Sequence, residues 1–384
     1  QPHQTHIQKE KEEINMRIGI EAQRIFRPDK HGMDFVILEV LRQLQSKDDS
    51  NEYFVFVAPG KDRCMKSTQR MHIIELGCTN YLLWEQWFLP RAAQKAQIDF
   101  LHCTSNTAPL YSPVPLMITL HDIIYLNREK PKGMSRYQQL GWCYRRWNIP
   151  RIINKCRTII TVSETEKGNI LKRFPKIEKR LHVVHNGYSN CYCPLSETDT
   201  YAVTQKYLPD KSFLLFLGNT DVRKNIKGVL RAYCEYLNHS QHPLSLVITG
   251  VNRSYVEYLL ANMGIEICIS HIIFTGYVPS EDLPGLYNGA SIFLFPSLQE
   301  GFGIPVLEAM ACGTPVITSN RSSLPEVAGG GGMLVNPNNP QEITDAILLL
   351  ENNAKVYQAQ VTYGLERVKQ FSWAHTAEEY LNIY

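Results

Sequence analysis

The chain has 384 residues, too many for one ordinary hydrophobic core, and this length predicts two domains. Hydrophobic residues make up 44% of the sequence and charged residues 20%, which is typical of a globular protein. No apolar run approaches the roughly 20 residues of a membrane-spanning helix.

The net charge of +3 hides an asymmetry between the two halves. Residues 16–195 hold 27 Lys and Arg against 16 Asp and Glu, a balance of +11, whereas residues 196–384 hold 11 against 18, a balance of −7. A basic half is typical of a domain with an anionic partner, and the alternative is ordinary variation of the surface.

The first fifteen residues, "QPHQTHIQKEKEEIN", have no apolar core and are not a signal peptide. They are interpreted as a tag-like or disordered leader, with Met16 as the native start. Ten cysteines occur without a Cys-x-x-Cys pair, and Cys191-Tyr-Cys193 lacks a second ligand pair. We therefore expect a reduced, cytoplasmic chain.

Short apolar runs rich in β-branched and aromatic residues recur through the first half. They lie at residues 16–22, 53–58, 72–76, 100–104, 116–122, 158–163 and 181–187. Such runs are typical of parallel strands buried on both faces. Helix-like segments at 34–46, 84–97 and 136–156 separate them, and the capping box from Ser163 to Glu166 predicts another helix.

Residues 188–211 are poor in strand-like runs and rich in turn residues, which predicts a linker. A second series of strand-like runs follows at 213–218, 244–250, 272–277, 292–297 and 315–320. The repeated alternation predicts an α/β protein with two doubly wound, Rossmann-like domains and an interdomain cleft. Ligands of such sheets lie beyond the carboxyl ends of the strands, so the loops there are the candidate site.

The loop "GNTDVRKN" (218–225) leaves a strand and enters a helix. Arg223 and Lys224 are adjacent cations at the helix start, where the helix dipole disfavours positive charge. A bound anion, such as a phosphate, explains this conflict, and the alternative is a solvated loop.

The stretch "LQEGFGIPVLEAMACGTPVI" (298–317) combines a glycine-rich loop, a helix start and two glutamates. Gly301 and Gly303 allow close approach of the backbone to a ligand, and the helix N-terminus favours an anion. The dipole alone accounts for Glu308 in the first helical turns, but not for Glu300 in the loop. Carboxylates suit the vicinal hydroxyls of a sugar and a ribose, so these features predict a pocket for a nucleotide diphosphosugar.

These motifs resemble those of the retaining glycosyltransferases of the GT4 family, which have the GT-B fold. The segment "EGFGIPVLE" is similar to the Glu-x7-Glu signature of the family. Other stretches fall in the order of the family, among them "LLWEQWFLPRAA", "FLHCTSNTAPL", "ITLHDIIYL", "TVSETEKGNIL", "VVHNGYS" and "RKNIKGVLRAY". The set most resembles a bacterial branch that contains mannosyltransferases of surface polysaccharide and lipopolysaccharide biosynthesis.

The resemblance covers nearly the whole chain after residue 15 and implies its organisation. It implies an N-terminal acceptor-binding domain over 16–195 and a C-terminal nucleotide-sugar-binding domain over 205–370. The last segment, 371–384, is similar to the final helix of the family, which crosses back onto the first domain.

The resemblance also implies roles for individual residues. Glu300 is expected to contact the donor sugar, Glu308 the ribose, and Arg223 with Lys224 the leaving diphosphate. His121 matches the family histidine beside the donor sugar, and the alternative is an ordinary core histidine. His121 and Glu300 are the implied catalytic residues. The other implied donor contacts are Gly32, Tyr277, Val278, Gly301, Phe302, Gly303 and Ile304.

The expected chemistry needs no metal and no cofactor. No Asp-x-Asp sequence occurs in the chain, and the basic pair with the helix N-terminus can stabilise the leaving diphosphate instead. Retention can follow from a covalent carboxylate intermediate or from attack on the same face. The sequence does not decide between them, although the second is generally favoured for the family.

The resemblance implies transfer of a hexose, with GDP-mannose favoured as donor, to a glycan or a polyprenyl-diphosphate-linked glycan. The stretch "RYQQLGWCYRRWNIPR" (136–151) mixes arginines with aromatic residues, which suits peripheral contact with an anionic membrane. The alternative is an amphipathic helix that packs its aromatic residues inward. No nucleic acid partner is expected.

Other functions remain open at this point. Relatives with UDP-glucose or UDP-N-acetylglucosamine donors and sugar-nucleotide epimerases share the GT-B fold. A dehydrogenase would need an early G-x-G-x-x-G after a strand, but "AGGGG" (328–332) precedes a strand. A non-catalytic carbohydrate-binding protein would have lost Glu300 or the basic pair, and both are present.

Overall fold

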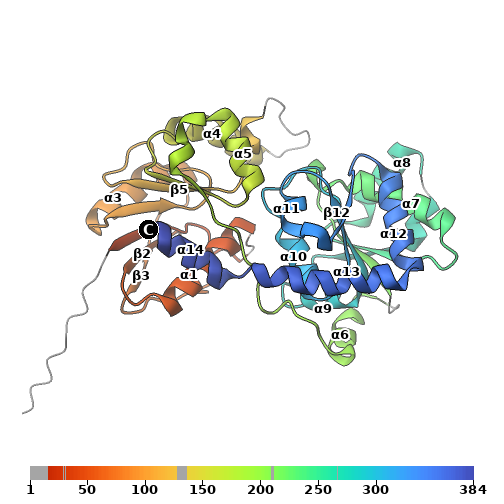
Figure 1. The fold of residues 1–384 in the computed structure, drawn as a ribbon. Coiled ribbons are helices and arrows are strands. Elements are labelled where there is room, and N and C mark those ends of the chain that lie inside the picture. Colours follow the sequence, from red (N-terminus) through yellow and green to blue (C-terminus); the bar gives the residue numbers. More distant parts are fainter. Residues whose placement is uncertain (1–15, 29, 31, 128–135, 209–211, 266) are drawn as a thin grey trace, which may run out of the picture. The chain divides into compact units, whose positions relative to one another are not determined.

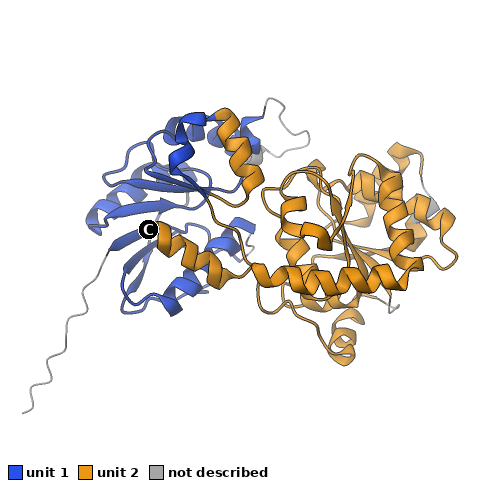
Figure 2. Cartoon of the chain, in the orientation of Figure 1, with its two compact units in different colours: residues 1–128, 134–160, 174–182 blue, residues 129–133, 161–173, 183–384 orange. Residues whose placement is uncertain are grey.

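The computed structural model describes residues 16–28, 30, 32–127, 136–208, 212–265 and 267–384 (Figure 1). The leader over 1–15 lies outside these residues. The chain divides into two compact units (Figure 2). Unit 1 comprises residues 1–128, 134–160 and 174–182, and unit 2 comprises residues 129–133, 161–173 and 183–384. The predicted boundaries at 16–195, 205–370 and 371–384 stay predictions.

The first sheet has seven strands in the order β3-β2-β1-β4-β5-β6-β7. The strands are β1 (Arg17–Glu21), β2 (Glu52–Val57), β3 (Met71–Glu75), β4 (Phe100–Cys103), β5 (Leu116–Leu120), β6 (Thr158–Thr161) and β7 (Leu181–Val183). The pairs from β3 to β5 are parallel. Every residue of β5 is buried, as a continuous apolar run predicts for a strand covered on both faces.

Helical segments connect the strands of unit 1. They are α1 (Gly32–Lys47), α2 (Tyr81–Leu83), the π-helix η1 (Trp84–Phe88), α3 (Leu89–Lys95), the 3-10 helices η2 (Ile124–Leu126) and η3 (Pro175–Arg180), and α4 (Arg136–Ile152). The helix predicted over 84–97 thus begins as a π-helical turn, which periodicity does not reveal.

The second sheet has six strands, all parallel, in the order β10-β9-β8-β11-β12-β13. They are β8 (Phe213–Leu217), β9 (Ser245–Thr249), β10 (Ile272–Gly276), β11 (Ala290–Phe295), β12 (Val316–Ser319) and β13 (Met333–Val335). In order of appearance this is 3-2-1-4-5-6, the arrangement of a Rossmann sheet. The order in which the strands follow the chain reverses between β8 and β11. Ligands of such sheets bind at this reversal point.

Helices cover both faces of the second sheet. The helices of unit 2 are α5 (Glu164–Arg173), α6 (Glu197–Thr204), α7 (Ile226–His239), α8 (Arg253–Met263), α9 (Leu283–Gly289), α10 (Ile304–Ala311), α11 (Leu324–Ala328), α12 (Pro340–Asn352), α13 (Ala354–Arg367) and α14 (Trp373–Ile383). The short helices η4 (Val222–Lys224), η5 (Ile267–His271), η6 (Gly329–Gly331) and η7 (Val368–Gln370) complete them.

Alternate side chains of β8 enter two separate hydrophobic clusters. Phe213 and Leu215 pack into one cluster, and Leu214 and Phe216 into the other. Since successive side chains of a strand point to opposite faces, both faces of the sheet are buried. This confirms the predicted doubly wound fold for unit 2.

Two predictions about this part of the chain need correction. Residues 188–211 are not only a linker, because α6 lies within them and packs Val203 against Gly285 of α9. Ser196 caps α6 by accepting a hydrogen bond from the Asp199 amide, a capping signal present in the sequence. Among the described residues eight cysteines are free, but Cys234 is disulfide-bonded, so the chain is not fully reduced in this structure.

No helix in the described ranges is long and apolar enough to cross a membrane.

Candidate active site

The loops after β8 and β11 meet at the reversal point of the second sheet. The Lys224 Nζ lies 2.7 Å from the Glu300 Oε1, and both side chains are largely buried. Lys224 also lies over the Phe295 ring, with its Nζ 5.1 Å from the centroid. The topology therefore unites a cation and a carboxylate that are 76 residues apart in the sequence.

Backbone contacts fix these loops against each other. The Leu298 amide donates to the Arg223 carbonyl at 2.7 Å. The Asn225 Nδ2 donates to the carbonyls of Pro296 and Pro337 at 3.0 and 2.7 Å. Asn225 adopts a left-handed conformation with φ 60°, which asparagine tolerates better than most residues. Asn225 therefore joins the ends of three strands and holds Lys224 in place.

Arg223 already has an anionic partner in this structure. Its guanidinium donates to both carboxylate oxygens of Asp221, with the Nε 2.9 Å from the Oδ2. Asp221 also accepts a hydrogen bond from the Arg223 amide and so caps η4. The two cations thus precede α7 in a short 3-10 turn, rather than lying within its first turn.

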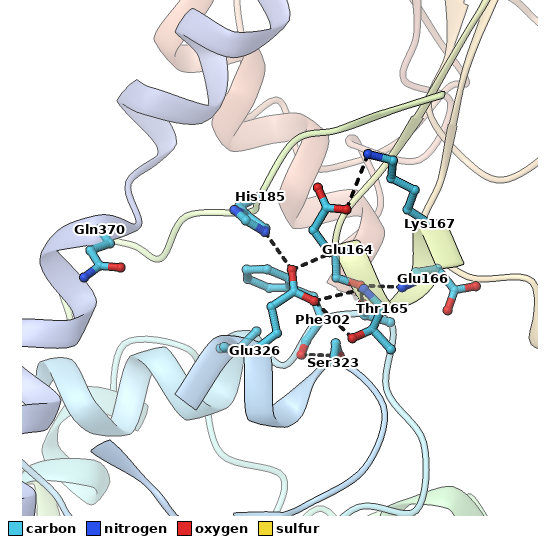
Figure 3. Close-up of polar contacts among 12 residues, drawn as sticks. Glu164, Thr165, Glu166, Lys167, His185, Phe302, Ser323, Glu326 and Gln370 are labelled. Atoms are coloured by element: carbon cyan, nitrogen blue, oxygen red, sulfur yellow. Dashed lines mark hydrogen bonds and ion pairs between the residues drawn. The ribbon is translucent and has the colours of Figure 1, made fainter. Parts of the chain in front are cut away.

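The carbonyls of the glycine-rich loop are tied back into the protein. The Ser323 Oγ donates to the carbonyls of Glu300 and Phe302 at 3.0 and 2.7 Å, and the Ser163 Oγ donates to the Gly301 carbonyl at 3.0 Å. The Glu300 amide donates to the Ser322 Oγ at 3.0 Å. Figure 3 shows the contact between Ser323 and Phe302.

The amides that follow have no such partners. Within the described ranges, no hydrogen bond is donated by the backbone N–H of Phe302, Gly303 or Ile304. These groups lie at the N-terminus of α10, where unsatisfied N–H groups and the helix dipole favour an anion. The loop therefore has the electrostatics of a phosphate-binding turn.

Gly303 is required by this turn. Its φ is 121°, and a Cβ added there would lie 2.7 Å from the Leu324 Cδ2. A side chain would thus meet both backbone strain and a steric clash. The structure gives Gly303 a conformational role, whereas Gly301 lies in the loop without a positive φ.

Glu326 of α11 is a polar hub that sequence reasoning missed (Figure 3). Its carboxylate accepts hydrogen bonds from the amides of Glu164 and Thr165 at 2.8 and 3.0 Å, and it contacts the His185 Nε2 at 2.8 Å. Burial tends to raise the pKa of Glu326, but these bonds lower it to about 2. Glu326 therefore caps α5 as a carboxylate.

Phe302 links this hub to the glycine-rich loop. Its ring is buried and lies 5.9 Å from the rings of both His185 and Phe371. Ser163, which caps α5 through the Glu166 amide, bonds the same loop at the Gly301 carbonyl. The serine side chain of the predicted capping box thus serves as the cap of α5.

Glu308 occupies a different environment from Glu300. It lies on α10, partly buried, and accepts a hydrogen bond from the Tyr287 hydroxyl at 3.0 Å. Burial raises the pKa of Glu308 to about 7, although the hydroxyls of Tyr287 and Tyr192 act against the shift. The two glutamates thus differ in partners: a cation for Glu300 and phenols for Glu308.

The two predicted base contacts lie directly after β10. Tyr277 is 77% exposed, whereas Val278 is buried in a core cluster of unit 2. Tyr277 therefore has a ring available to stack on a ligand, and Val278 contributes packing.

His121 lies in unit 1, just beyond β5, and is buried. Its Nε2 lies 2.9 Å from the Thr104 carbonyl, and its amide donates to the Asn106 Oδ1 at 2.6 Å. Burial lowers the pKa of His121 to about 4, so the ring is neutral at pH 7. Because a carbonyl only accepts, the Nε2 carries the proton and the Nδ1 is left as an acceptor.

Gly32 is exposed and begins α1, and a Cβ there would meet nothing within 4 Å. No backbone requirement for glycine therefore exists at this position. Across the described ranges, no group of three or more His, Cys, Asp and Glu side chains could hold a metal ion.

Comparison with known proteins places this geometry in a family. Residues 31–189 match the family model "Glycosyltransferase Family 4", and residues 202–367 match "Glycosyl transferases group 1". O-antigen chain mannosyltransferase B from Escherichia coli is 30% identical over 364 residues, which are 92% of this chain and 89% of that protein. The serotype-specific mannosyltransferase WbdA from Escherichia coli is 36% identical over 273 residues, 69% of this chain and 32% of that protein.

Solved structures support the same fold. Sucrose-phosphate synthase from Thermosynechococcus elongatus superposes with a TM-score of 0.72 at 19% identity, covering 96% of this chain and 98% of that one. The two Rossmann-like units and the loops at the reversal point are those of a sugar-transferring enzyme with the GT-B fold. The chain belongs to the GT4 family of glycosyltransferases, which confirms the predicted family, fold and enzyme class.

Proposed function

We propose that this enzyme transfers mannose from GDP-mannose, with retention, to a lipid-linked glycan acceptor in the assembly of a surface polysaccharide. The similarity to O-antigen chain mannosyltransferase B, over nearly the full length of both chains, carries this proposal. In it, the C-terminal domain binds the donor and the N-terminal domain binds the acceptor.

The donor diphosphate binds between the α10 N-terminus and Lys224. Three amides that have no hydrogen-bond partner among the described residues, together with one ammonium group, offer the hydrogen bonds and positive charge that the leaving group needs. Arg223 adds a second cation beside them, and Tyr277 stacks on the base through its exposed ring.

The two glutamates act on different parts of the donor. Glu300, in the loop, accepts bonds from the hydroxyls of the reacting sugar, so Glu300→Gln is expected to lower kcat by misplacing the sugar. Glu308, on the helix, contacts the ribose, so Glu308→Gln is expected to raise the donor KM with little change in kcat. If Glu300→Gln changed only the donor KM and Glu308→Gln lowered kcat, the two roles would be reversed. If neither variant changed kcat or KM, the donor pocket would lie elsewhere.

His121 lies beside the donor sugar in this proposal. A neutral imidazole whose Nε2 proton is committed to the Thr104 carbonyl offers its Nδ1 as an acceptor for a sugar hydroxyl. His121 then positions the donor instead of supplying charge. Gly32, at the start of α1 in the same unit, is a further donor contact in this proposal.

Catalysis proceeds without a divalent metal, because Lys224 and the α10 amides supply the positive field. The leaving diphosphate takes the proton of the acceptor hydroxyl during attack on the same face. We expect transfer to continue in EDTA. Loss of transfer in EDTA, with recovery on adding Mg²⁺ or Mn²⁺, would contradict this step.

Peripheral contact with an anionic membrane brings the enzyme to its acceptor. Two exposed tryptophans of unit 1 each carry an arginine on the ring: Trp87 with Arg91, 3.2 Å from the centroid, and Trp147 with Arg151, 4.7 Å from the centroid. Such pairs suit a lipid interface with negative headgroups. Trp87→Ala with Trp147→Ala should reduce co-sedimentation with anionic vesicles, and equal binding by the wild type and the double variant would contradict the contact.

The decisive experiment is a thermal-shift panel of GDP, UDP and their sugars, followed by transfer assays with the stabilising donor. A ligand that binds the native state raises the melting temperature by mass action. Stabilisation by GDP-mannose and an α-linked product by NMR would support the proposal. Stabilisation by UDP but not by GDP would show that the donor is a UDP-sugar instead of GDP-mannose. Turnover of a UDP-sugar without acceptor would indicate an epimerase.

A further inference from the structure

The protein binds two carbonyl groups of the glycine-rich loop and leaves the N–H groups that follow them available. The carbonyls of Glu300 and Phe302 accept hydrogen bonds from the Ser323 Oγ at 3.0 and 2.7 Å. The backbone N–H groups of Gly301 and Gly303 donate no hydrogen bond within the described residues. Bound carbonyls and available N–H groups therefore alternate along the loop.

Holding the carbonyls fixes the direction of the N–H groups. Peptide bonds are planar, and the described part of the chain contains no cis peptide bond. In a trans peptide the N–H points opposite to the carbonyl of the preceding residue, so the Glu300 carbonyl sets the direction of the Gly301 N–H. The Phe302 carbonyl sets the direction of the Gly303 N–H in the same way. Because both carbonyls point at Ser323, both N–H groups point away from it.

The Ser323 hydroxyl serves this loop instead of its own helix. Ser323 is the N-cap residue of α11, where a serine side chain normally accepts a hydrogen bond from an amide of the first turn. Among the described residues its hydroxyl makes no such bond, and its one proton is shared between the two loop carbonyls. Ser323 is 1% exposed, so water does not compete for these bonds. Such a departure from local preference indicates a role at the site.

Two further serines hold the same loop. The Ser322 Oγ accepts a hydrogen bond from the Glu300 amide at 3.0 Å, and the Ser163 Oγ donates to the Gly301 carbonyl at 3.0 Å. The Gly303 carbonyl accepts an amide of the first α10 turn at 3.0 Å. The peptide groups of the loop are thus fixed in the free protein, before a ligand arrives.

We propose that Ser323 is a positioning residue of the donor site, which turns the N–H groups of Gly301 and Gly303 toward the diphosphate of the donor. In this role Ser323 acts through the peptide groups that it holds, and Figure 3 shows its contact with Phe302. N–H groups that are already aimed stabilise the charge that develops on the leaving diphosphate without reorganisation during the reaction. The inference rests on the proposed function, in which this loop binds the donor diphosphate.

The first experiment measures binding of GDP and UDP by calorimetry, and binding of guanosine and uridine by ligand-observed NMR. Ser323→Ala should raise the Kd of the diphosphate that binds the wild type by about tenfold, as expected when hydrogen bonds to a charged group are misaligned. The Kd of the matching nucleoside should stay unchanged, because Ser323 does not orient the groups that bind the base and the ribose. Ser323→Cys, which keeps about the same size and has a weak donor, should fall between wild type and Ser323→Ala.

Thr344→Val is the matched control. The Thr344 hydroxyl is also completely buried and is shared between two carbonyls, those of Ala232 and Pro340, at 2.9 and 3.1 Å. It lies on α12 in the same unit and does not contact the glycine-rich loop. Thr344→Val should therefore lower the melting temperature about as much as Ser323→Ala does, but leave the Kd of the diphosphate unchanged.

The second experiment observes the two N–H groups themselves. Gly301 is the only glycine in the sequence that follows a glutamate, and Gly303 the only one that follows a phenylalanine. Protein with ¹⁵N-labelled glycine and ¹³C-carbonyl-labelled glutamate or phenylalanine therefore gives one selected amide signal in each case. The bound diphosphate should move both signals downfield in the wild type and in Thr344→Val, and clearly less in Ser323→Ala.

Several outcomes would overturn the positioning role. They are an unchanged Kd of the diphosphate in both Ser323 variants, equal weakening of diphosphate and nucleoside, and a wild type that binds neither GDP nor UDP. If Ser323→Ala does not fold, Ser323→Cys is judged by the same criteria. If the wild type binds UDP but not GDP, or binds GDP and transfers no mannose, and binding still depends on Ser323, the positioning role stands and the proposed function fails.

Discussion

Replacing Lys224 by alanine tests the donor site at its centre. In the free protein, Lys224 is bound to Glu300 at 2.7 Å, with 27% and 15% of the two side chains exposed. A nucleoside diphosphate must therefore compete with Glu300 for the ammonium group. The pair predicts effects of opposite sign for the two residues: Lys224→Ala weakens binding of GDP, and Glu300→Gln strengthens it.

The magnitudes follow from the kind of contact. A hydrogen bond to a charged group contributes about 1.5–3 kcal/mol, so Lys224→Ala should raise the Kd of GDP by roughly 10- to 150-fold. The ion pair is partly exposed to solvent, where such pairs contribute about 0.5–1 kcal/mol. Glu300→Gln should therefore lower the Kd of GDP by roughly 2- to 5-fold.

Isothermal titration calorimetry with GDP measures both effects. Lys227→Ala is the matched control, because Lys227 is an exposed lysine at the start of α7, three residues beyond Lys224. An unchanged Kd of GDP for Lys224→Ala would contradict the assignment of Lys224 to the donor diphosphate. Weaker binding of GDP by Glu300→Gln would show that Glu300 holds the loop in shape, instead of competing for Lys224.

Three further predictions concern stability. Burial raises the pKa of Glu308 to about 7, so the folded state holds its proton more tightly than the unfolded chain, and stability falls as the pH rises from about 4.5 to 7. Glu308→Gln should thus be more stable than the wild type at pH 8 by about 1–3 kcal/mol and equal at pH 5; a difference independent of pH would contradict this. The pH dependence of stability is opposite for Glu326, because its pKa of about 2 in the folded state gives stability above pH 4.5 that is lost as the pH falls toward 2. Glu326→Gln should cost about 1–3 kcal/mol at pH 7 and much less at pH 3 by thermal melts, and an equal cost at both would refute the carboxylate cap. Gly303→Ala should cost about 1–3 kcal/mol in urea denaturation, whereas Gly168→Ala, in open space on α5, should cost nothing; equal stabilities would remove the strain argument.

The strands could be predicted from the sequence because they are buried on both faces. Continuous runs such as "LMITL" and "FLLFL" have no competing helical period, and the structure makes them β5 and β8. The strand over 333–335 could be anticipated only from the glycine run before it. The doubly wound fold then follows from strand and helix alternation, since crossover connections bring successive parallel strands into one sheet.

Contacts between distant segments could not be predicted in the same way. The pairing of Lys224 with Glu300 depends on strand order, which places β8 beside β11. Glu326 carries no local signal of its role, because its partners lie about 160 residues earlier.

The Lys224–Glu300 pair has a consequence for which ligand the donor site selects. In the free protein the two charges satisfy each other, so a ligand that takes Lys224 leaves Glu300 without a partner. A nucleoside diphosphate replaces Glu300 at the lysine but offers nothing to the carboxylate. A nucleotide sugar offers both groups, because its diphosphate binds Lys224 and its hydroxyls bind Glu300 under the proposed roles. The pair therefore favours binding of the intact donor over binding of the released product. Glu300→Gln should bring the dissociation constants of the nucleotide sugar and of GDP closer together, even though it tightens the binding of GDP.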